Sequence, residues 1–365
     1  MKSYLAILWD ACDPKAARLA AEVSRDIQAR YGDAAVSTAG LHFFDLSDRG
    51  SGVKSRCYWS GQPPGETLVF GTLFPRRDDA PKCRELVDIT PMSFDRIVQS
   101  AGKVLVEEYW GNYVAILRTG LDISILADPT GSIPCYVTRK DGVTFAFSHL
   151  ERCPALKSEW FSIDWDFLGE LLVYDKGEPD RTGLREITEV PGSCRLSIRE
   201  DGIRREYVWD PSHFARKCLN GTASDTAEQL RHVTNHVIHT WASWSGKASM
   251  QLSGGLDSSI VMSCLTGIQD PIPLSAHHFR LSSEDNEETH YAKAAANAAS
   301  LPLRIIDVDP ETTLPPLDSH PRSTRPFRQF FGAPQMPASL DQSVQFTGQG
   351  GDHLFLETRS TDGFA

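Results

Sequence analysis

The sequence predicts a mixed α/β protein with two domains, a β-rich α+β domain followed by an α/β domain built on a doubly wound parallel sheet. Three observations support this. The chain has 365 residues, which is long for one domain and suits two. Its first two hundred or so residues contain short apolar runs of strand length. Further on, helical and strand-like segments alternate, and strands separated by helices favour a parallel sheet.

The first domain is predicted over residues 1–209. Apolar or alternating runs predict its strands at 3–9, 67–74, 143–147, 194–199 and 203–209. In 143–147 and 194–199 the alternation places the apolar side chains on one face of the strand. Asp201-Gly202 is typical of a hairpin turn between the last two strands. Helices are predicted at 14–30 and 165–174.

A change in composition places a linker at 210–224 and a second domain at 225–365. Apolar residues at helical spacing predict the first helix of this domain; they are Ala227, Leu230, Val233, Val237 and Trp241. Strands are predicted at 248–252, 272–279, 303–308 and 344–347. Helices are predicted from about residue 260 and at 286–299.

Residues 252–259 read LSGGLDSS and join the strand 248–252 to the following helix. The glycines allow a tight turn with exposed amides, the serines add hydroxyl donors, and amides at a helix N-terminus bind phosphate or pyrophosphate. Asp257 would repel phosphate unless a cation lay between them, and Mg²⁺ is the natural bridge. An ordinary Gly-Ser turn is the plain alternative. The predicted nucleotide-binding residues here are Leu252, Ser253, Gly254, Gly255, Asp257, Ser258 and Ser259.

A second glycine loop follows the strand 344–347, where residues 346–355 read FTGQGGDHLF. Gly348, Gly350 and Gly351 are predicted to contact the nucleotide. Asp352 is predicted to hold Mg²⁺ together with Asp257, and both are candidate catalytic residues. A plain glycine turn with a solvated aspartate is the alternative.

The pattern SGGLDSS, followed roughly ninety residues later by G-x-G-G-D, resembles the synthetase domain of the asparagine synthetase family. In the first domain, WGNYVAIL at 110–117, DPTGSIPCY at 128–136 and VPGS at 190–193 resemble landmarks of that family's glutaminase domain. The resemblance implies an Ntn-hydrolase-like first domain and an ATP-pyrophosphatase second domain. It also implies an AMP-forming carboxylate–amine ligase that uses ATP and Mg²⁺.

Three departures from the family pattern bear on this implication. Lys2 stands where the family's glutaminase has its N-terminal cysteine, and Cys12 is internal, so we expect no release of ammonia from glutamine. Gln349 and His353 replace two acids of the glutamine-dependent enzymes. The chain ends at Ala365, and we expect a truncated family member that lacks a C-terminal helical stretch.

Among the family's branches, these departures favour the lasso-peptide macrolactam synthetases, in which an activated Asp or Glu side chain of a peptide is attacked by its own N-terminal amine. The implied partners are a precursor peptide, or another peptide or small-molecule carboxylate, and a leader-peptide protease. Three alternatives remain open: an asparagine synthetase-like enzyme using free ammonia, a β-lactam synthetase-like enzyme, and an inactive remnant.

Composition excludes other classes of protein. The net charge of −11 argues against a nucleic-acid partner, and no apolar run approaches the roughly 18–20 residues that span a bilayer. Eight cysteines without a C-x-x-C pair favour reduced thiols and a cytoplasmic protein. His277 and His278 lack partners at metal-ligand spacing and are expected in the core or lining an adenine pocket.

Overall fold

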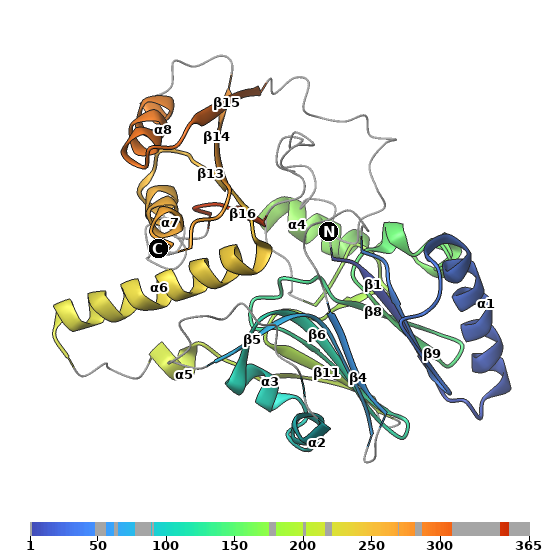
Figure 1. Cartoon of the computed structure of the whole chain (residues 1–365). Coiled ribbons are helices and arrows are strands. Elements are labelled where there is room, and N and C mark those ends of the chain that lie inside the picture. Colours follow the sequence, from blue (N-terminus) through green and yellow to red (C-terminus); the bar gives the residue numbers. More distant parts are fainter. Residues whose placement is uncertain are drawn as a thin grey trace.

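The computed structural model describes residues 2–47, 56–61, 65–76, 89, 91–174, 180–199, 202–215, 221–268, 270–281, 287–308 and 344–349 (Figure 1). Their strands form two six-stranded sheets in the first part of the chain and a four-stranded sheet in the second. The coarse prediction of a mixed α/β protein is therefore confirmed. Its finer parts, the Ntn-hydrolase type and the double winding, stay predictions.

The first sheet is antiparallel throughout. Across the sheet its strands are β10 (Thr188–Glu189), β8 (Tyr136–Lys140), β9 (Val143–Phe147), β1 (Tyr4–Trp9), β3 (Leu41–Asp45) and β2 (Val36–Thr38). Helix α1 (Pro14–Tyr31) packs on one face and buries Ala20, Val23 and Ile27 against it. The helix starts where the sequence predicts, because Asp13 caps its first amides and Pro14 occupies the first turn.

The second sheet is also antiparallel. Its strands in order are β12 (Gly202–Tyr207), β11 (Cys194–Arg199), β7 (Asp122–Ala127), β6 (Tyr109–Thr119), β5 (Glu66–Pro75) and β4 (Arg56–Ser60). Helices α2 (Pro91–Gln99) and α3 (Lys103–Glu108) pack on one face through side chains that include Ile97 and Leu105. The predicted last strand, 203–209, ends earlier, at Tyr207.

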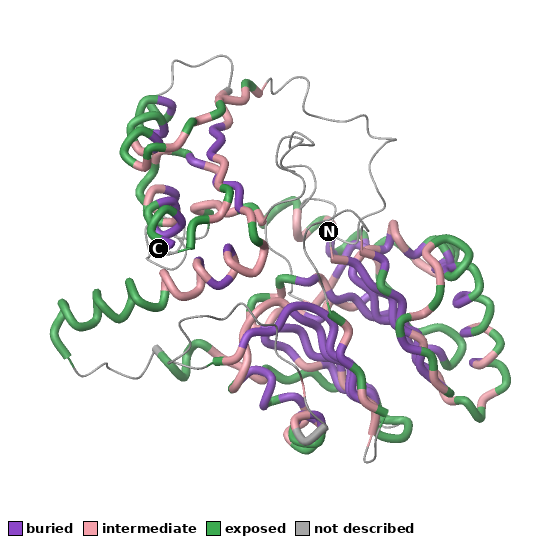
Figure 2. The backbone as a smooth tube through the Cα atoms, in the orientation of Figure 1, coloured by how far each residue is buried: buried purple, intermediate pink, exposed green. Residues whose placement is uncertain are grey.

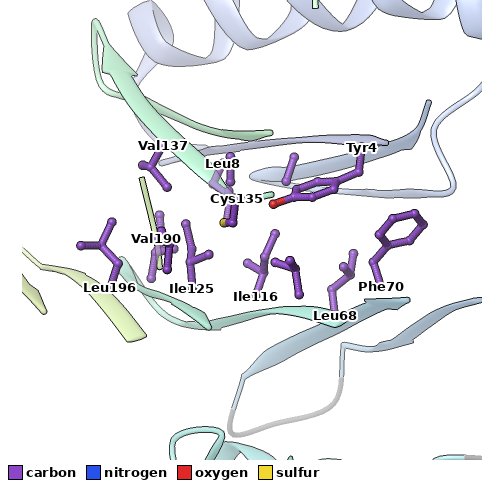
Figure 3. Close-up of a cluster of buried hydrophobic side chains, with 14 of the residues drawn as sticks. Tyr4, Leu8, Leu68, Phe70, Ile116, Ile125, Cys135, Val137, Val190 and Leu196 are labelled. Atoms are coloured by element: carbon purple, nitrogen blue, oxygen red, sulfur yellow. The ribbon is translucent and has the colours of Figure 1, made fainter. Parts of the chain in front are cut away.

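The two sheets pack face to face around a continuous apolar core (Figure 3). Tyr4 and Leu8 from β1 meet Leu68 and Phe70 from β5 and Ile116 from β6. Because helices cover the outer faces, each sheet has apolar surface on both sides. Strand β9 is consequently buried along its whole length, and Val143, Phe145 and Phe147 pack together on one of its faces, as the alternation predicts.

Shorter elements complete the first part of the chain. They are the 3₁₀ turns η1 (Leu150–Arg152) and η2 (Ser158–Trp160) and the helices α4 (Trp165–Tyr174) and α5 (Ser212–Ala215). Helix α4 has the predicted bounds, and α5 lies within the predicted linker 210–224. The division into domains itself stays a prediction.

Helix α6 (Ala223–Ser245) begins two residues before the predicted domain start at 225. Thr222 and Asp225 form a capping box that fixes this start. Residues 223–233 are exposed, so the first half of the helix contributes nothing to a core (Figure 2). Leu230 and Val233, whose spacing helped to predict this helix, are 50% and 57% exposed.

The third sheet is parallel, as predicted, with the strand order β15 (Leu303–Val308), β14 (Leu274–Leu281), β13 (Ala248–Gln251) and β16 (Val344–Phe346). Helices α7 (Leu256–Thr266) and α8 (Glu287–Ala298) pack against it. Strand β14 begins two residues later than expected, directly after Pro273, because a proline has no N–H to donate to the ladder.

An aromatic cluster connects α6 to the second sheet. The ring of Trp241 lies 5.0 Å from that of Phe74 at the end of β5 and 6.3 Å from that of Trp110 at the start of β6. Trp110 also lies 6.0 Å from the ring of His236, one turn earlier in α6. The second half of α6 therefore packs on the first domain while the same helix contacts β16 and α7.

The helices and cysteines of the described residues bear on the expectations drawn from composition. None of the helices there is long and apolar enough to cross a membrane. The six cysteines in the described ranges are free thiols, and four of them are buried.

Candidate nucleotide-binding site

The order of the parallel strands reverses at β13. Strands β14 and β15 follow β13 on one side, whereas β16, later in the chain, pairs with its other side. Such a reversal opens a crevice beyond the carboxyl ends of the strands, where ligands of parallel sheets bind. Met250 pairs with Phe346, so the two predicted glycine loops leave the sheet side by side.

The first loop turns directly into α7. Gly255 is the N-cap residue and no side chain caps the helix, so the amides of the first turn are donors available to an anion. The hydroxyls of Ser258 and Ser259 donate to the carbonyl of Gly255, at 3.0 and 2.8 Å, and Ser258 is only 2% exposed. In this structure the two hydroxyls thus hold the turn rather than remaining free for a ligand.

Gly254 lies tightly against α8. Its φ is +92°, a conformation that residues with a Cβ rarely adopt. A Cβ there would lie 2.6 Å from the amide nitrogen of Ala292 and 2.7 Å from the carbonyl oxygen of Glu288. The glycine is required both by the backbone conformation and by the neighbouring helix.

The second loop meets the first at Gly348. A Cβ on Gly348 would lie 2.6 Å from the amide nitrogen of Ser258 and 3.0 Å from its Cα. The structure therefore brings Gly348 beside the first turn of α7, which carries Asp257. Gly350, Gly351 and Asp352 lie outside the described residues, so the pairing of Asp352 with Asp257 stays a prediction.

The chemistry of these groups fits a phosphate with a divalent cation. The uncapped amides suit phosphate oxygens, and the half-buried Asp257 offers a carboxylate beside them. Within the described ranges no three His, Cys, Asp or Glu side chains are grouped to hold a metal ion. The magnesium site at Asp257 and Asp352 therefore stays a prediction.

His277 and His278 are both 1% exposed, so they belong to the core. Nδ1 of His278 lies 2.8 Å from the carbonyl oxygen of Leu252, and its Nε2 lies 3.0 Å from Oγ1 of Thr289. The ring of His277 instead lies near the hydroxyl of Ser249, at 3.3 Å. The contact of His278 with the first glycine loop could not be predicted, since no pattern within the strand reveals it.

The three first-domain segments that carry the family resemblance meet at Asp128, which is fully buried. Its carboxylate accepts hydrogen bonds from the amides of Thr130 at 2.8 Å, Ser132 at 3.2 Å and Tyr113 at 3.3 Å. Its carbonyl accepts one from the amide of Ser193 at 3.0 Å. Burial raises the pKa of Asp128, and its hydrogen bonds oppose that rise.

Lys2 joins both parts of the chain. Its Nζ donates to Oγ1 of Thr72 on β5 at 2.6 Å and to Oδ1 of Asn112 on β6 at 2.5 Å. The same ammonium lies 5.9 Å from the ring centre of Trp244 on α6. Burial lowers the pKa of Lys2 from 10.5 to about 7, although Asp128 and Asp45 oppose this shift. From the sequence, Lys2 marked only the absence of the family's N-terminal cysteine, and these contacts were not predicted.

The lowered pKa of Lys2 predicts a pH dependence of stability. Between about pH 7 and 10.5 the unfolded chain binds a proton at Lys2 that the folded chain does not. The contribution of Lys2 to the free energy of unfolding should therefore rise through this window, by at most about 1.4 kcal/mol per pH unit, and be flat below it. Urea denaturation of the protein and of Lys2→Met across pH 6–10 measures it. A difference in the free energy of unfolding between the parent protein and Lys2→Met that does not change with pH would contradict the prediction.

Comparisons with solved structures give only distant similarities. Two solved structures are similar: the glutamine phosphoribosylpyrophosphate amidotransferase from B. subtilis complexed with ADP and GMP, and a structure described as the allosteric regulatory enzyme of purine biosynthesis. The first is 10% identical, and the match covers 83% of this chain and 65% of that one. The second is 9% identical, and the match covers 84% of this chain and 74% of that one. Both have a TM-score of 0.30, too low to establish a shared fold.

No curated protein matches this sequence. A family model does match: residues 230–357 fit the model described as asparagine synthase. The matched range contains the parallel sheet, both glycine loops and Asp352. Residues 230–357 are thus similar to an asparagine synthase domain, which supports membership of the asparagine synthetase family.

Proposed function

We propose that this protein is an ATP-dependent ligase that activates a carboxylate as its adenylate and passes the acyl group to an amine. The observation that carries the proposal is the contact between the two glycine loops. Gly348, from the loop after β16, lies against the uncapped first turn of α7, which carries Asp257. This arrangement lies at the reversal of strand order, where ligands of parallel sheets bind.

In the proposed mechanism the amides of the first turn of α7 bind the β- and γ-phosphates. Asp257, with Asp352, would hold a magnesium ion, which would neutralise phosphate charge. The substrate carboxylate attacks the α-phosphorus and pyrophosphate leaves. An amine then attacks the acyl carbon, loses its proton and displaces AMP, leaving an amide. The chain contributes chiefly positioning and electrostatic stabilisation.

The finer proposal is that the substrate is a peptide and the product a macrolactam of the lasso type. Lys2 occupies the position at which glutaminase domains of this family carry their nucleophile, and it is held by Thr72 and Asn112. A first domain without that nucleophile would supply no ammonia, and in the proposed reaction the amine belongs to the substrate itself. A precursor peptide and a leader-peptide protease would be the partners, and the cytoplasm the location.

A second candidate is synthesis of asparagine from aspartate and free ammonia. The match of residues 230–357 to the asparagine synthase model favours it. It needs no glutaminase, so Lys2 does not argue against it. A β-lactam synthetase-like reaction uses the same loops but joins an amine and a carboxylate of one small molecule.

The two candidates differ in their product. The protein should be incubated with Mg²⁺, ATP and a peptide that has a free N-terminal amine and acidic side chains, taken from a precursor gene beside its own. We expect AMP and a peptide lighter by one water, with the N-terminal amine blocked. Turnover of aspartate and ammonia to asparagine, with no change in the peptide, would contradict the macrolactam proposal and support the second candidate.

A further inference from the structure

We propose that His278 is a positioning residue that sets the phosphate loop against α8, so that the loop amides face pyrophosphate in the right geometry. The inference rests on the proposed function, because it assigns a role in the same site. His278 lies on β14, and its side chain is buried between the end of β13 and the start of α8. It is thus not expected to touch the nucleotide itself.

The hydrogen bonds of His278 use both of its ring nitrogens and indicate which one carries the hydrogen in the neutral ring. The carbonyl oxygen of Leu252 can only accept, so Nδ1, 2.8 Å away, carries the hydrogen and donates it. In the neutral ring Nε2 then has a free lone pair, which accepts the hydroxyl hydrogen of Thr289 at 3.0 Å. The ring therefore links the loop backbone to α8 with both nitrogens used, which leaves neither for an adenine.

The two hydrogen bonds of His278 lie beside Gly254, where the loop approaches α8 most closely. Leu252 is two residues before Gly254, and Thr289 is in the first turn of α8 next to Glu288, whose carbonyl contacts Gly254. The amide of Leu252 donates to the carbonyl of His277 at 2.8 Å, so the strand backbone holds one side of this residue and the His278 ring the other. The two contacts leave Leu252 little freedom where the chain departs from the sheet.

A loss of this link should affect phosphate binding selectively. If Leu252 and α8 separate, the amides after Gly254 lose their common orientation, whereas the rest of the parallel sheet keeps its ladder. The affinity for pyrophosphate and ATP should fall, and the affinity for AMP, which lacks the β- and γ-phosphates, should not. A purely structural role would weaken all three in proportion to lost stability.

The chain offers a graded set of variants. Thr289→Val removes the hydroxyl at nearly constant shape, and Thr289→Ser restores it. His278→Asn can keep the donor to Leu252, since its amide nitrogen replaces Nδ1, but it cannot reach Thr289. His278→Phe removes both bonds. His277→Phe is the matched control, because His277 is equally buried on the same strand but contacts Ser249 instead of the loop.

The test is calorimetric titration of the full chain with Mg²⁺-pyrophosphate, Mg²⁺-ATP and AMP, with folding checked by circular dichroism. We expect pyrophosphate and ATP to bind about fivefold more weakly to Thr289→Val and His278→Asn, the loss of roughly one hydrogen bond. His278→Phe should be weaker still, while Thr289→Ser, His277→Phe and every AMP affinity stay near those of the parent chain.

Each outcome decides between the two proposals. Unchanged pyrophosphate affinity in folded Thr289→Val and His278→Asn would overturn the role of His278 and leave the proposed function standing. A loss of AMP affinity equal to that of pyrophosphate would also overturn it. If the parent chain bound neither pyrophosphate nor ATP, the proposed function would fail, and this inference with it. Should His278→Phe not fold, the two milder variants still carry the test.

Discussion

Replacement of Asp257 by asparagine is expected to reduce AMP formation at least a hundredfold, because it removes the carboxylate that would hold magnesium beside the first-turn amides of α7. Stability should change little. An acidic residue in the first turn of a helix contributes only about 0.3–1 kcal/mol. Release of AMP and pyrophosphate from ATP, measured with the carboxylate substrate present, checks the expectation.

Glu228→Gln is the control for Asp257→Asn. It makes the same change from carboxylate to amide at an exposed position on the first half of α6, far along the chain from both glycine loops. Turnover should stay at the parent level in this control. Near-parent turnover by Asp257→Asn would remove this residue from the proposed magnesium site.

Gly254→Ala is expected to abolish ATP binding and to destabilise the second domain. The φ of +92° costs a residue with a Cβ about 1–2 kcal/mol. The added methyl group would lie 2.6–2.8 Å from atoms of Ala292, Glu288 and Tyr291, and overpacking of this kind costs about 1–3 kcal/mol more. The strain acts on the loop itself, so the binding of Mg²⁺-ATP should fall more steeply than stability does.

Gly267→Ala serves as the matched control for Gly254→Ala. Gly267 follows the C-terminus of the same helix, α7, at a φ of −83°, and a Cβ there would meet its nearest atoms at 3.4 Å and 3.5 Å. We expect normal ATP binding and nearly unchanged urea denaturation. If Gly254→Ala bound ATP as well as Gly267→Ala does, the close contact with α8 would not matter for the site.

The second part of the chain was the easier to predict from the sequence. Short apolar runs located β13, β15 and β16 to within a residue, and the alternation with helices predicted a parallel sheet. The pairing of Gly348 with Ser258 needed the structure, since nothing in the sequence places β16 next to β13.

The first part was predicted less completely, for physical reasons. Strand β1 pairs with β3 and with β9, which lies far along the chain, and periodicity carries no information on such distant partners. Strand β9 is buried on both faces, so its alternation does not reveal which face meets the other sheet. Lys2 and His278 were missed because their roles depend on contacts with remote segments, Trp244 for the first and Leu252 for the second.

The central claim is that ATP is cleaved between its α- and β-phosphates at the paired glycine loops. It is tested most directly by incubating the full chain with Mg²⁺, γ-labelled ATP and the acidic peptide, and separating the labelled products. We expect labelled pyrophosphate in equal amount to AMP, with both absent in Asp257→Asn. Labelled orthophosphate with ADP, or pyrophosphate release that persists in Asp257→Asn, would contradict it.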